Sequence, residues 1–134
     1  LYWRDFYAHT AFFFPRVFGH SFKPEFEVKT TAENLQAAIE GESYENTQMY
    51  PKFITEAKTE NADKAAKSFI WANDTEKKHE VFYRKALEAL TAKTENTLPT
   101  AYFVCPVCGN TYDANNVDEK CAFCMTPKDK FEKI

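Results

Sequence analysis

The feature that most restricts the fold of this chain is a pair of Cys-x-x-Cys motifs near its end. The only four cysteines in the sequence are Cys105, Cys108, Cys121 and Cys124. Each Cys-x-x-Cys turn directs two sulfurs toward one point, so two turns together give tetrahedral thiolate coordination of zinc or of a single iron. A module this small buries too little apolar surface to fold without its metal. We therefore predict a small metal-bound domain over residues 102–134.

The spacing of the cysteines does not select the metal. A zinc knuckle that only stabilises the fold and an iron site that carries electrons both use four thiolates. A disulfide framework is disfavoured, because nothing in the sequence indicates secretion and thiols stay reduced in the cytosol. Redox chemistry of the thioredoxin type is also disfavoured, because it would use one Cys-x-x-Cys pair on an α/β scaffold.

Two helices are expected before the cysteines. Thr30 and Glu33 have the spacing of a capping box, which predicts the start of the first helix. Its inward face repeats at steps of three and four residues. The members of this face are Leu35, Ala38, Ile39, Glu42, Glu45, Met49 and Phe53. Pro51 is expected to kink this helix or to end its first part, and the polar residues 58–61 to separate it from a second helix over about residues 62–92.

The inward face of the second helix also mixes apolar and titratable residues. Its members are Ala65, Phe69, Ala72, Glu76, His79, Tyr83, Ala86 and Leu90. A buried carboxylate without a partner is costly, so a glutamate on such a face points to solvent, pairs with a cation or binds a metal. Residues three apart on a helix can reach one ion, which applies to Glu76 with His79 and to Glu42 with Glu45.

Taken alone, the Glu-x-x-His motif has a simpler explanation. Charge-rich helices often contain it by chance, with a solvated Glu76 and a surface or core His79. The second acidic pair on the preceding helix and the cysteine site downstream favour a metal instead. Helical bundles that hold two iron or manganese ions are built from these same parts.

Composition excludes several classes of function. No stretch approaches the roughly 20 apolar residues of a membrane-spanning helix, and a formal charge of −3 provides no basic field for nucleic acid. Residues 1–28 are rich in aromatics without a regular period, so we expect an extended segment that packs these rings, with His9 and His20 as packing or surface histidines. The segment lacks the pattern of a secretory signal, which predicts a cytoplasmic protein.

Together the motifs resemble those of the rubrerythrin family, over about residues 30–134. The family's Gly-Glu-x-x-Glu, followed by Met-Tyr-Pro, is matched by Gly41 to Glu45 and by Met49 to Pro51. Its Glu-x-x-His and its rubredoxin-like cysteines are matched as well. The resemblance implies a mainly α fold, with a ferritin-like helical hairpin that is half of a four-helix bundle, followed by a rubredoxin-like domain. The domain boundaries expected from it are 1–29 for the aromatic segment, 30–94 for the hairpin, 95–101 for a linker and 102–134 for the cysteine domain.

The resemblance also implies an activity, since rubrerythrins are non-haem diiron peroxidases that reduce hydrogen peroxide to water in defence against oxidative stress. It makes Glu42 and His79 terminal iron ligands and Glu76 a bridge. Glu45 would exchange with histidine as the irons change oxidation state, and Tyr50 would lie beside the ligands, so these two are the expected catalytic residues. The iron of the four cysteines would relay single electrons from rubredoxin or from an NAD(P)H-dependent reductase.

The chain departs from the family in two respects. The first two helices of the family's bundle supply another Glu and another Glu-x-x-His, and residues 1–29 contain neither pattern. Because the chain carries only half of the ligands, we predict a homodimer or larger homo-oligomer that shares the irons. The alternatives are a separate chain that carries the missing half, an exchange of helices within a larger assembly, or an inactive remnant. Asn110 stands where rubredoxins usually have an aromatic residue, and Met125 where they often have glycine. We expect these two replacements to alter the hydrogen bonds to the cysteine sulfurs. The competing functions are a rubredoxin-like electron carrier and a zinc-ribbon protein.

Overall fold

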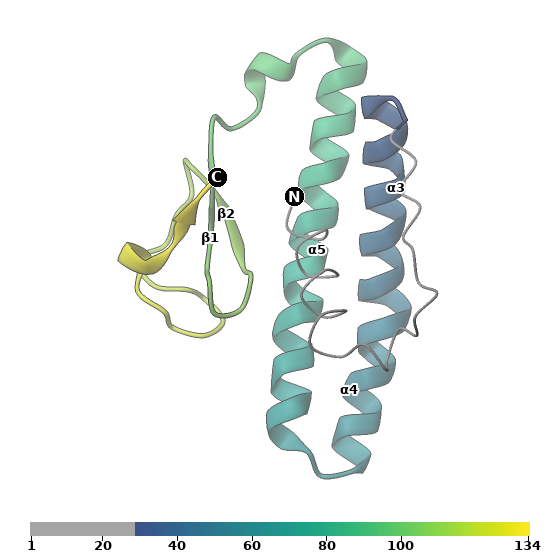
Figure 1. Cartoon of the computed structure of the whole chain (residues 1–134), viewed down its shortest axis with the longest axis vertical. Coiled ribbons are helices and arrows are strands. Elements are labelled where there is room, and N and C mark those ends of the chain that lie inside the picture. Colours follow the sequence, from purple (N-terminus) through teal and green to yellow (C-terminus); the bar gives the residue numbers. More distant parts are fainter. Residues whose placement is uncertain (1–28) are drawn as a thin grey trace, which may run out of the picture.

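The computed structural model describes residues 29–134, which form two long helical arms side by side and a small strand domain next to the second arm (Figure 1). The first arm consists of α3 (Thr31–Tyr44), a π-helical segment (Glu45–Met49) and α4 (Tyr50–Thr59). The second arm is the single helix α5 (Asp63–Ala92). Both helices predicted from the sequence are thus confirmed, within one residue of the expected starts.

The expectations for the start of the chain are not tested. The extended aromatic segment over residues 1–28, with His9 and His20, lies outside the described residues. Within the described part, no helix combines the length and the apolar character needed to cross a membrane.

The capping box at the start of α3 is present as predicted. The Thr30 hydroxyl accepts from the backbone N–H of Glu33 at 3.3 Å, and the Thr30 backbone N–H donates to the Glu33 carboxylate at 3.0 Å. Two backbone groups that helix geometry leaves without partners are satisfied in this way.

The first arm widens into a π-helix just before Pro51. Proline has no N–H, and its ring collides with the carbonyl four residues earlier in a regular α-helix. Here the backbone N–H of Tyr50 donates to the carbonyl of Glu45, five residues back, and Pro51 then occupies the first turn of α4. The predicted irregularity at Pro51 therefore takes the form of a π-turn that begins at Glu45, and such turns are frequent at functional sites.

A tight turn reverses the chain between the arms. Asn61 adopts the left-handed conformation, with φ of 57°. The N–H of Ala62 donates to the carbonyl of Ala57 at 2.8 Å, and that of Asn61 donates to Lys58 at 3.1 Å. This is the Schellman pattern that ends many helices, and it places α5 antiparallel to α3 and α4.

The strand domain is a three-stranded antiparallel sheet in the order β2-β1-β3. Its strands are β1 (Tyr102–Val104), β2 (Thr111–Asp113) and β3 (Glu132–Lys133). The ring of Tyr112 stacks on Phe131, with centroids 5.4 Å apart. Two short 3-10 turns complete the domain and its linker, Glu95–Thr97 and Lys128–Lys130.

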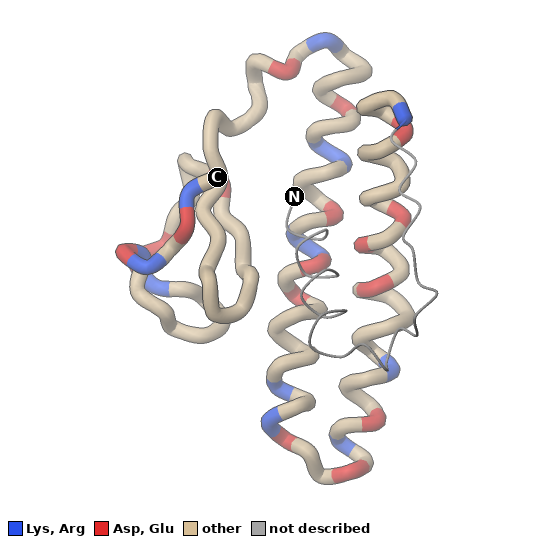
Figure 2. The backbone as a smooth tube through the Cα atoms, in the orientation of Figure 1, with Lys and Arg blue, Asp and Glu red and all other residues tan. Residues whose placement is uncertain are grey.

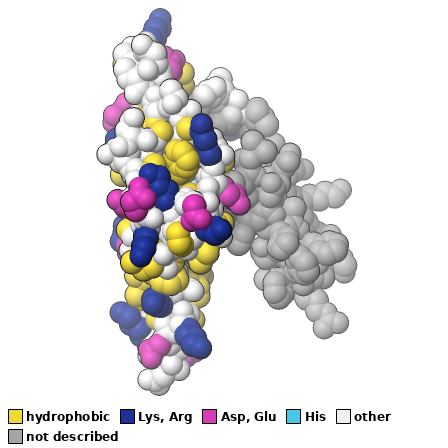
Figure 3. Space-filling model, turned by 90° about the vertical axis from the view of Figure 1, so that its left-hand side faces the viewer, with side chains coloured by type: hydrophobic (Ala, Val, Ile, Leu, Met, Phe, Trp, Pro, Cys, Tyr) yellow, Lys and Arg dark blue, Asp and Glu magenta, His cyan; other side chains and the backbone are white. Residues whose placement is uncertain are grey.

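The strand domain packs against α5. The Lys78 ammonium lies 4.8 Å from the ring centre of Tyr112 and 4.9 Å from that of Phe123, a geometry typical of cation–π contacts. Farther along α5, Phe82 meets Tyr102 edge to face at 5.2 Å. Seen from this side of the molecule, lysine, acidic and apolar side chains are interspersed (Figure 3).

The packed domain gives α5 a second buried face. Thr75 is only 3% exposed although it lies outside the predicted inward stripe. Its hydroxyl donates to the backbone carbonyl of Cys108 at 3.4 Å. The inward stripe predicted from the sequence covers only the face of α5 that contacts the first arm. The face that contacts the strand domain is a second buried face that the stripe does not include.

Candidate metal centres

Three side chains of the two helical arms converge on one point. Glu42 comes from α3, and Glu76 and His79 come from successive turns of α5; their ligand atoms all lie within 4.8 Å of one another. The Nδ1 atom of His79 is 2.8 Å from Glu76 Oε2 and 3.8 Å from Glu42 Oε1. Glu42 is 4% and Glu76 8% exposed. Figure 2 shows acidic segments of both arms facing each other midway along the hairpin.

Burial and mutual repulsion make these carboxylates hard to ionise together. Burial, and then the charges of Glu76, Glu45 and Glu80, raise the pKa of Glu42 well above its ordinary value. Burial and Glu76 raise the pKa of Glu45 to about 7, although His79 opposes the shift. Either protons or a cation must therefore neutralise the cluster near neutral pH.

Glu80 has partners of its own at the edge of the cluster. It accepts a hydrogen bond from the Asn46 amide at 2.6 Å and pairs with the Arg84 guanidinium, and these contacts lower its pKa. Glu80 therefore stays ionised and adds to the negative potential at Glu42.

The chemistry of the cluster suits a divalent metal. Glu42 Oε2 and Glu45 Oε2 are buried and have no hydrogen-bond partner among the described residues. Buried carboxylate oxygens without partners are rare in stable proteins, and a bound cation would satisfy both. Carboxylate oxygens combined with one imidazole suit iron and manganese.

Of the two residues expected to be catalytic, Glu45 lies close to this group but outside it, and Tyr50 lies among aromatic rings. Glu45 opens the π-turn and is near enough for its pKa to respond to Glu76 and His79, yet it is not among the three that converge. Tyr50 packs against Phe53 and Phe69, with ring centroids 6.3 and 6.4 Å away.

One neighbour of the cluster received no role from the sequence. Burial, and then the charges of Glu42 and Glu76, raise the pKa of Tyr83, which places its hydroxyl in the field of the carboxylates. Its position on the inward stripe of α5 was the signal available, but an aromatic there is as well explained by packing.

The four cysteines meet as predicted. Their sulfurs lie within 4.8 Å of one another and form no disulfide. Cys105 Sγ is 3.4 Å from Cys124 Sγ, and Cys108 Sγ is 3.4 Å from Cys121 Sγ. Four thiols at such distances are arranged for one tetrahedral ion.

The surroundings shift the pKa values of two of these thiols in opposite directions. Burial raises the pKa of Cys108. Burial has the same effect on Cys121, but hydrogen bonds from the backbone N–H groups of Cys124 and Phe123 outweigh it and lower the Cys121 pKa. The Asn110 amide also donates to Cys121 Sγ, at 3.7 Å. Asn110 thus contributes one hydrogen bond to a cysteine sulfur, and the environment favours a thiolate at Cys121.

The two clusters are connected through side chains that the sequence did not single out. Thr75 on α5 donates to the carbonyl of Cys108, and Thr111 on β2 lies 2.9 Å from the Nε2 atom of His79. A threonine in a strand or helix carries no pattern that marks such a contact. Only the packing of the domain on α5 brings these residues together.

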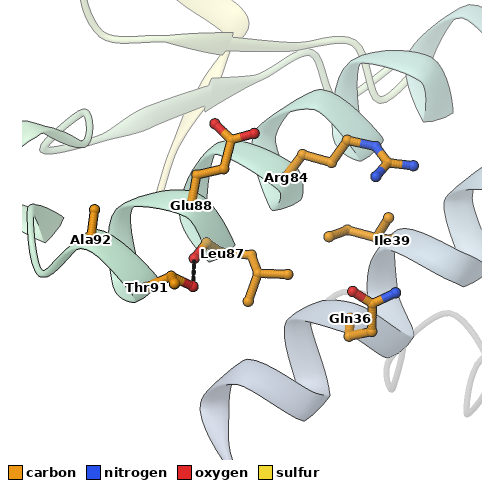
Figure 4. Close-up of a pocket in the computed structure, with 7 residues that line it drawn as sticks. All are labelled: Gln36, Ile39, Arg84, Leu87, Glu88, Thr91 and Ala92. Atoms are coloured by element: carbon orange, nitrogen blue, oxygen red, sulfur yellow. Dashed lines mark hydrogen bonds between the residues drawn. The ribbon is translucent and has the colours of Figure 1, made fainter.

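A pocket lies elsewhere between the arms, and Figure 4 shows Ile39 of α3 and Leu87 of α5 on its opposite sides. None of its lining residues belongs to either metal cluster. The lining residues are Gln36, Ile39, Arg84, Leu87, Glu88, Thr91 and Ala92.

Comparisons with known proteins cover both the helical arms and the four-cysteine domain. The family model described as Rubrerythrin matches residues 9–87, and that of the rubrerythrin rubredoxin-like domain matches residues 103–132. Rubrerythrin-2 of Clostridium acetobutylicum is 35% identical over 75% of this chain and 53% of its own length. Nigerythrin of Nitratidesulfovibrio vulgaris is 35% identical over 73% of this chain and 46% of its own.

Solved structures give the same picture. Partially reduced nigerythrin superposes with a TM-score of 0.70 and 30% identity, covering 96% of this chain and 60% of that one. The predicted fold class, a mainly α ferritin-like hairpin with a rubredoxin-like domain, is confirmed. The chain spans about half the length of the relatives that it matches.

Proposed function

We propose that this chain, which belongs to the rubrerythrin family, reduces hydrogen peroxide to water at a diiron site and receives its electrons through an iron bound by the four cysteines. Family membership supports an iron-binding oxidoreductase. The observation that carries the finer proposal is the convergence of Glu42, Glu76 and His79, with buried carboxylate oxygens that lack partners.

The family motifs suggest the ligand roles, and the convergence of the three side chains supports them. Glu42 and His79 would serve as terminal ligands, and Glu76, which is 2.8 Å from His79, as the bridge. Two ferrous ions held there would supply the two electrons that convert one peroxide to water. Glu45 is the carboxylate best able to change its contacts, since it begins a π-turn and lies outside the converging group. Tyr50, in the next turn, orients this region through its packing on Phe69.

The four-cysteine domain serves as the electron relay in this proposal. Its docking on α5 brings the backbone of Cys108 and the side chain of Thr111 against the helix that carries Glu76 and His79. The electron donor is rubredoxin or an NAD(P)H-dependent reductase. The location expected for this protein is the cytoplasm, where cysteines stay reduced and available to a metal.

A second copy of the chain completes the diiron site in this proposal. The described residues provide one hairpin, which is half of a four-helix bundle. Two hairpins related by a two-fold axis would contribute Glu42, Glu45, Glu76 and His79 twice, and a two-fold dimer is the commonest way to pair identical faces.

Reaction of the ferrous protein with peroxide tests this function. Anaerobic protein loaded with Fe²⁺ is mixed with hydrogen peroxide, and oxidation of the iron and loss of peroxide are followed by stopped-flow absorption. We expect about two electrons per peroxide, and a loss of at least about 100-fold in rate for Glu76→Gln. The matched control is Glu88→Gln, which changes an exposed glutamate on the same helix. This variant should react with peroxide at the rate of the original protein.

The two competing functions give other results. A rubredoxin-like carrier would show the iron–thiolate absorption but no peroxide reaction that depends on Glu76. A zinc-ribbon protein would show neither. Either result would contradict the proposal.

A further inference from the structure

The hydroxyl of Thr111 touches a candidate metal ligand of the other domain. Its Oγ1 atom lies 2.9 Å from His79 Nε2 and 3.0 Å from the backbone carbonyl oxygen of Gly109. A hydroxyl has one proton, and a carbonyl oxygen can only accept. The Thr111 hydroxyl therefore donates to Gly109 and accepts from His79, so the proton of the imidazole lies on Nε2.

This assignment fixes what the other side of the ring presents. With the proton on Nε2, the neutral imidazole has its lone pair on Nδ1. Nδ1 is the atom that lies 2.8 Å from Glu76 and 3.8 Å from Glu42. Nδ1 thus faces the carboxylates, with a proton between it and Glu76 Oε2 that a metal ion would displace. Water has little access to the Thr111 hydroxyl on the other side of the ring, since Thr111 is 7% exposed.

We propose that Thr111 is a positioning residue that holds His79 in the Nε2–H tautomer, so that docking of the four-cysteine domain prepares the helical metal site. The inference rests on the proposed function in assuming that the cluster binds a metal. It adds a residue from a different domain to the support of that site. Hydrogen bonds of this kind to a ligating histidine fix its orientation and raise its basicity.

Other contacts of the same interface leave His79 untouched. Thr75 donates to the Cys108 carbonyl at 3.4 Å, and Lys78 donates to the Asn110 amide oxygen at 2.7 Å. Thr75 is buried and carries the same side chain as Thr111. Thr75→Val therefore removes one interdomain hydrogen bond without changing the partner of the histidine, and it is the matched control.

The first test reads the histidine directly. The whole 134-residue chain receives one equivalent of Zn²⁺, which fills the four-cysteine site. Nitrogen-15 NMR then follows the His79 ring. We expect a protonated Nε2 whose hydrogen exchanges slowly with water in the original protein, in Thr111→Ser and in Thr75→Val. Thr111→Val should lose the slow exchange. A Nε2 without a proton, or one that Thr111→Val leaves unchanged, would overturn the proposal.

The second test reads the metal site. Fe²⁺ is titrated anaerobically into the same zinc-loaded proteins by calorimetry. Loss of a hydrogen bond to a ligating histidine typically weakens metal binding by about 10- to 100-fold, and we expect this for Thr111→Val. Thr111→Ser and Thr75→Val should stay within about threefold of the original. Equal weakening in Thr75→Val and Thr111→Val would show that docking alone matters and would contradict a specific role for Thr111.

These outcomes separate the inference from the proposed function. A Thr111→Val protein that binds Fe²⁺ normally refutes the inference while leaving the peroxidase proposal intact. An original protein with the expected histidine tautomer but no reaction with peroxide refutes the function and retains the positioning role. Thr111→Ser guards against a folding defect, because it keeps the hydroxyl and loses only a methyl group.

Discussion

Backbone conformation at two single residues shapes the four-cysteine site. Gly109 and Met125 each follow the second cysteine of a Cys-x-x-Cys turn, with φ of 76° and 64°. The N–H of Gly109 donates to the Cys105 carbonyl and that of Met125 to the Cys121 carbonyl, both at 2.9 Å. The two turns therefore share one geometry, and both need a left-handed residue at this point.

Replacing Met125 by glycine should stabilise the protein. A side chain in the left-handed region costs roughly 1–2 kcal/mol, and the greater flexibility of unfolded glycine offsets part of the gain. We expect Met125→Gly to raise the free energy of unfolding of the zinc-loaded protein by about 0.5–1 kcal/mol in urea denaturation. Gly109→Ala should lower the free energy of unfolding by about 1 kcal/mol. The Cβ of the alanine would lie 3.7 Å from Thr75 Cγ2, an ordinary contact distance, so the loss comes from the left-handed backbone conformation and not from a clash. A Met125→Gly protein less stable than the original would refute this account.

At the scale of the elements, the two arms bring negative charge together. The first arm contributes Glu42 and Glu45, and α5 contributes Glu76 and Glu80, close enough for their charges to interact. In the absence of a cation this arrangement opposes helix packing whenever the carboxylates are ionised. The same charge attracts a metal, so the arms are held together most firmly when the site is filled.

The burial of Glu45 and its repulsion by Glu76 together predict that stability falls as pH rises when the cluster lacks metal. Because folding raises the pKa of Glu45 from 4.5 to about 7, the folded state binds its proton more tightly than the unfolded state. The contribution to stability is complete below pH 4.5 and is lost as pH rises through about 7. After allowance for partial exposure, the loss is about 1–2 kcal/mol.

Glu45→Gln isolates this effect. Urea denaturation of protein with zinc in the four-cysteine site alone, between pH 5 and pH 8, should show a smaller decline for Glu45→Gln than for the original. The variant should be the more stable of the two at pH 8. Glu88→Gln, which is exposed, should decline like the original. Identical slopes for the original and Glu45→Gln would mean that Glu45 titrates normally.

At the scale of the whole molecule, local features were predictable and the contact between the domains was not. The capping box at Thr30 and the cysteine spacing depend on neighbours close in sequence, so their patterns identify them. Glu76 and His79 were found because a helix fixes which residues share a face. The contact of Thr111 with His79 joins residues 32 positions apart in sequence, and nothing local encodes it. The π-turn before Pro51 was foreseen only as an irregularity, since a proline can be accommodated in several ways.

In the proposed assembly, two chains share one diiron site while each holds a further iron in its cysteines. Iron content per chain, measured by elemental mass spectrometry together with the mass of the anaerobic protein in solution, tests it most directly. We predict a dimer or larger assembly with about two irons per chain, falling to about one in Glu76→Gln while the iron–thiolate absorption persists. About one iron per chain in the original protein, unchanged by Glu76→Gln, would contradict the account.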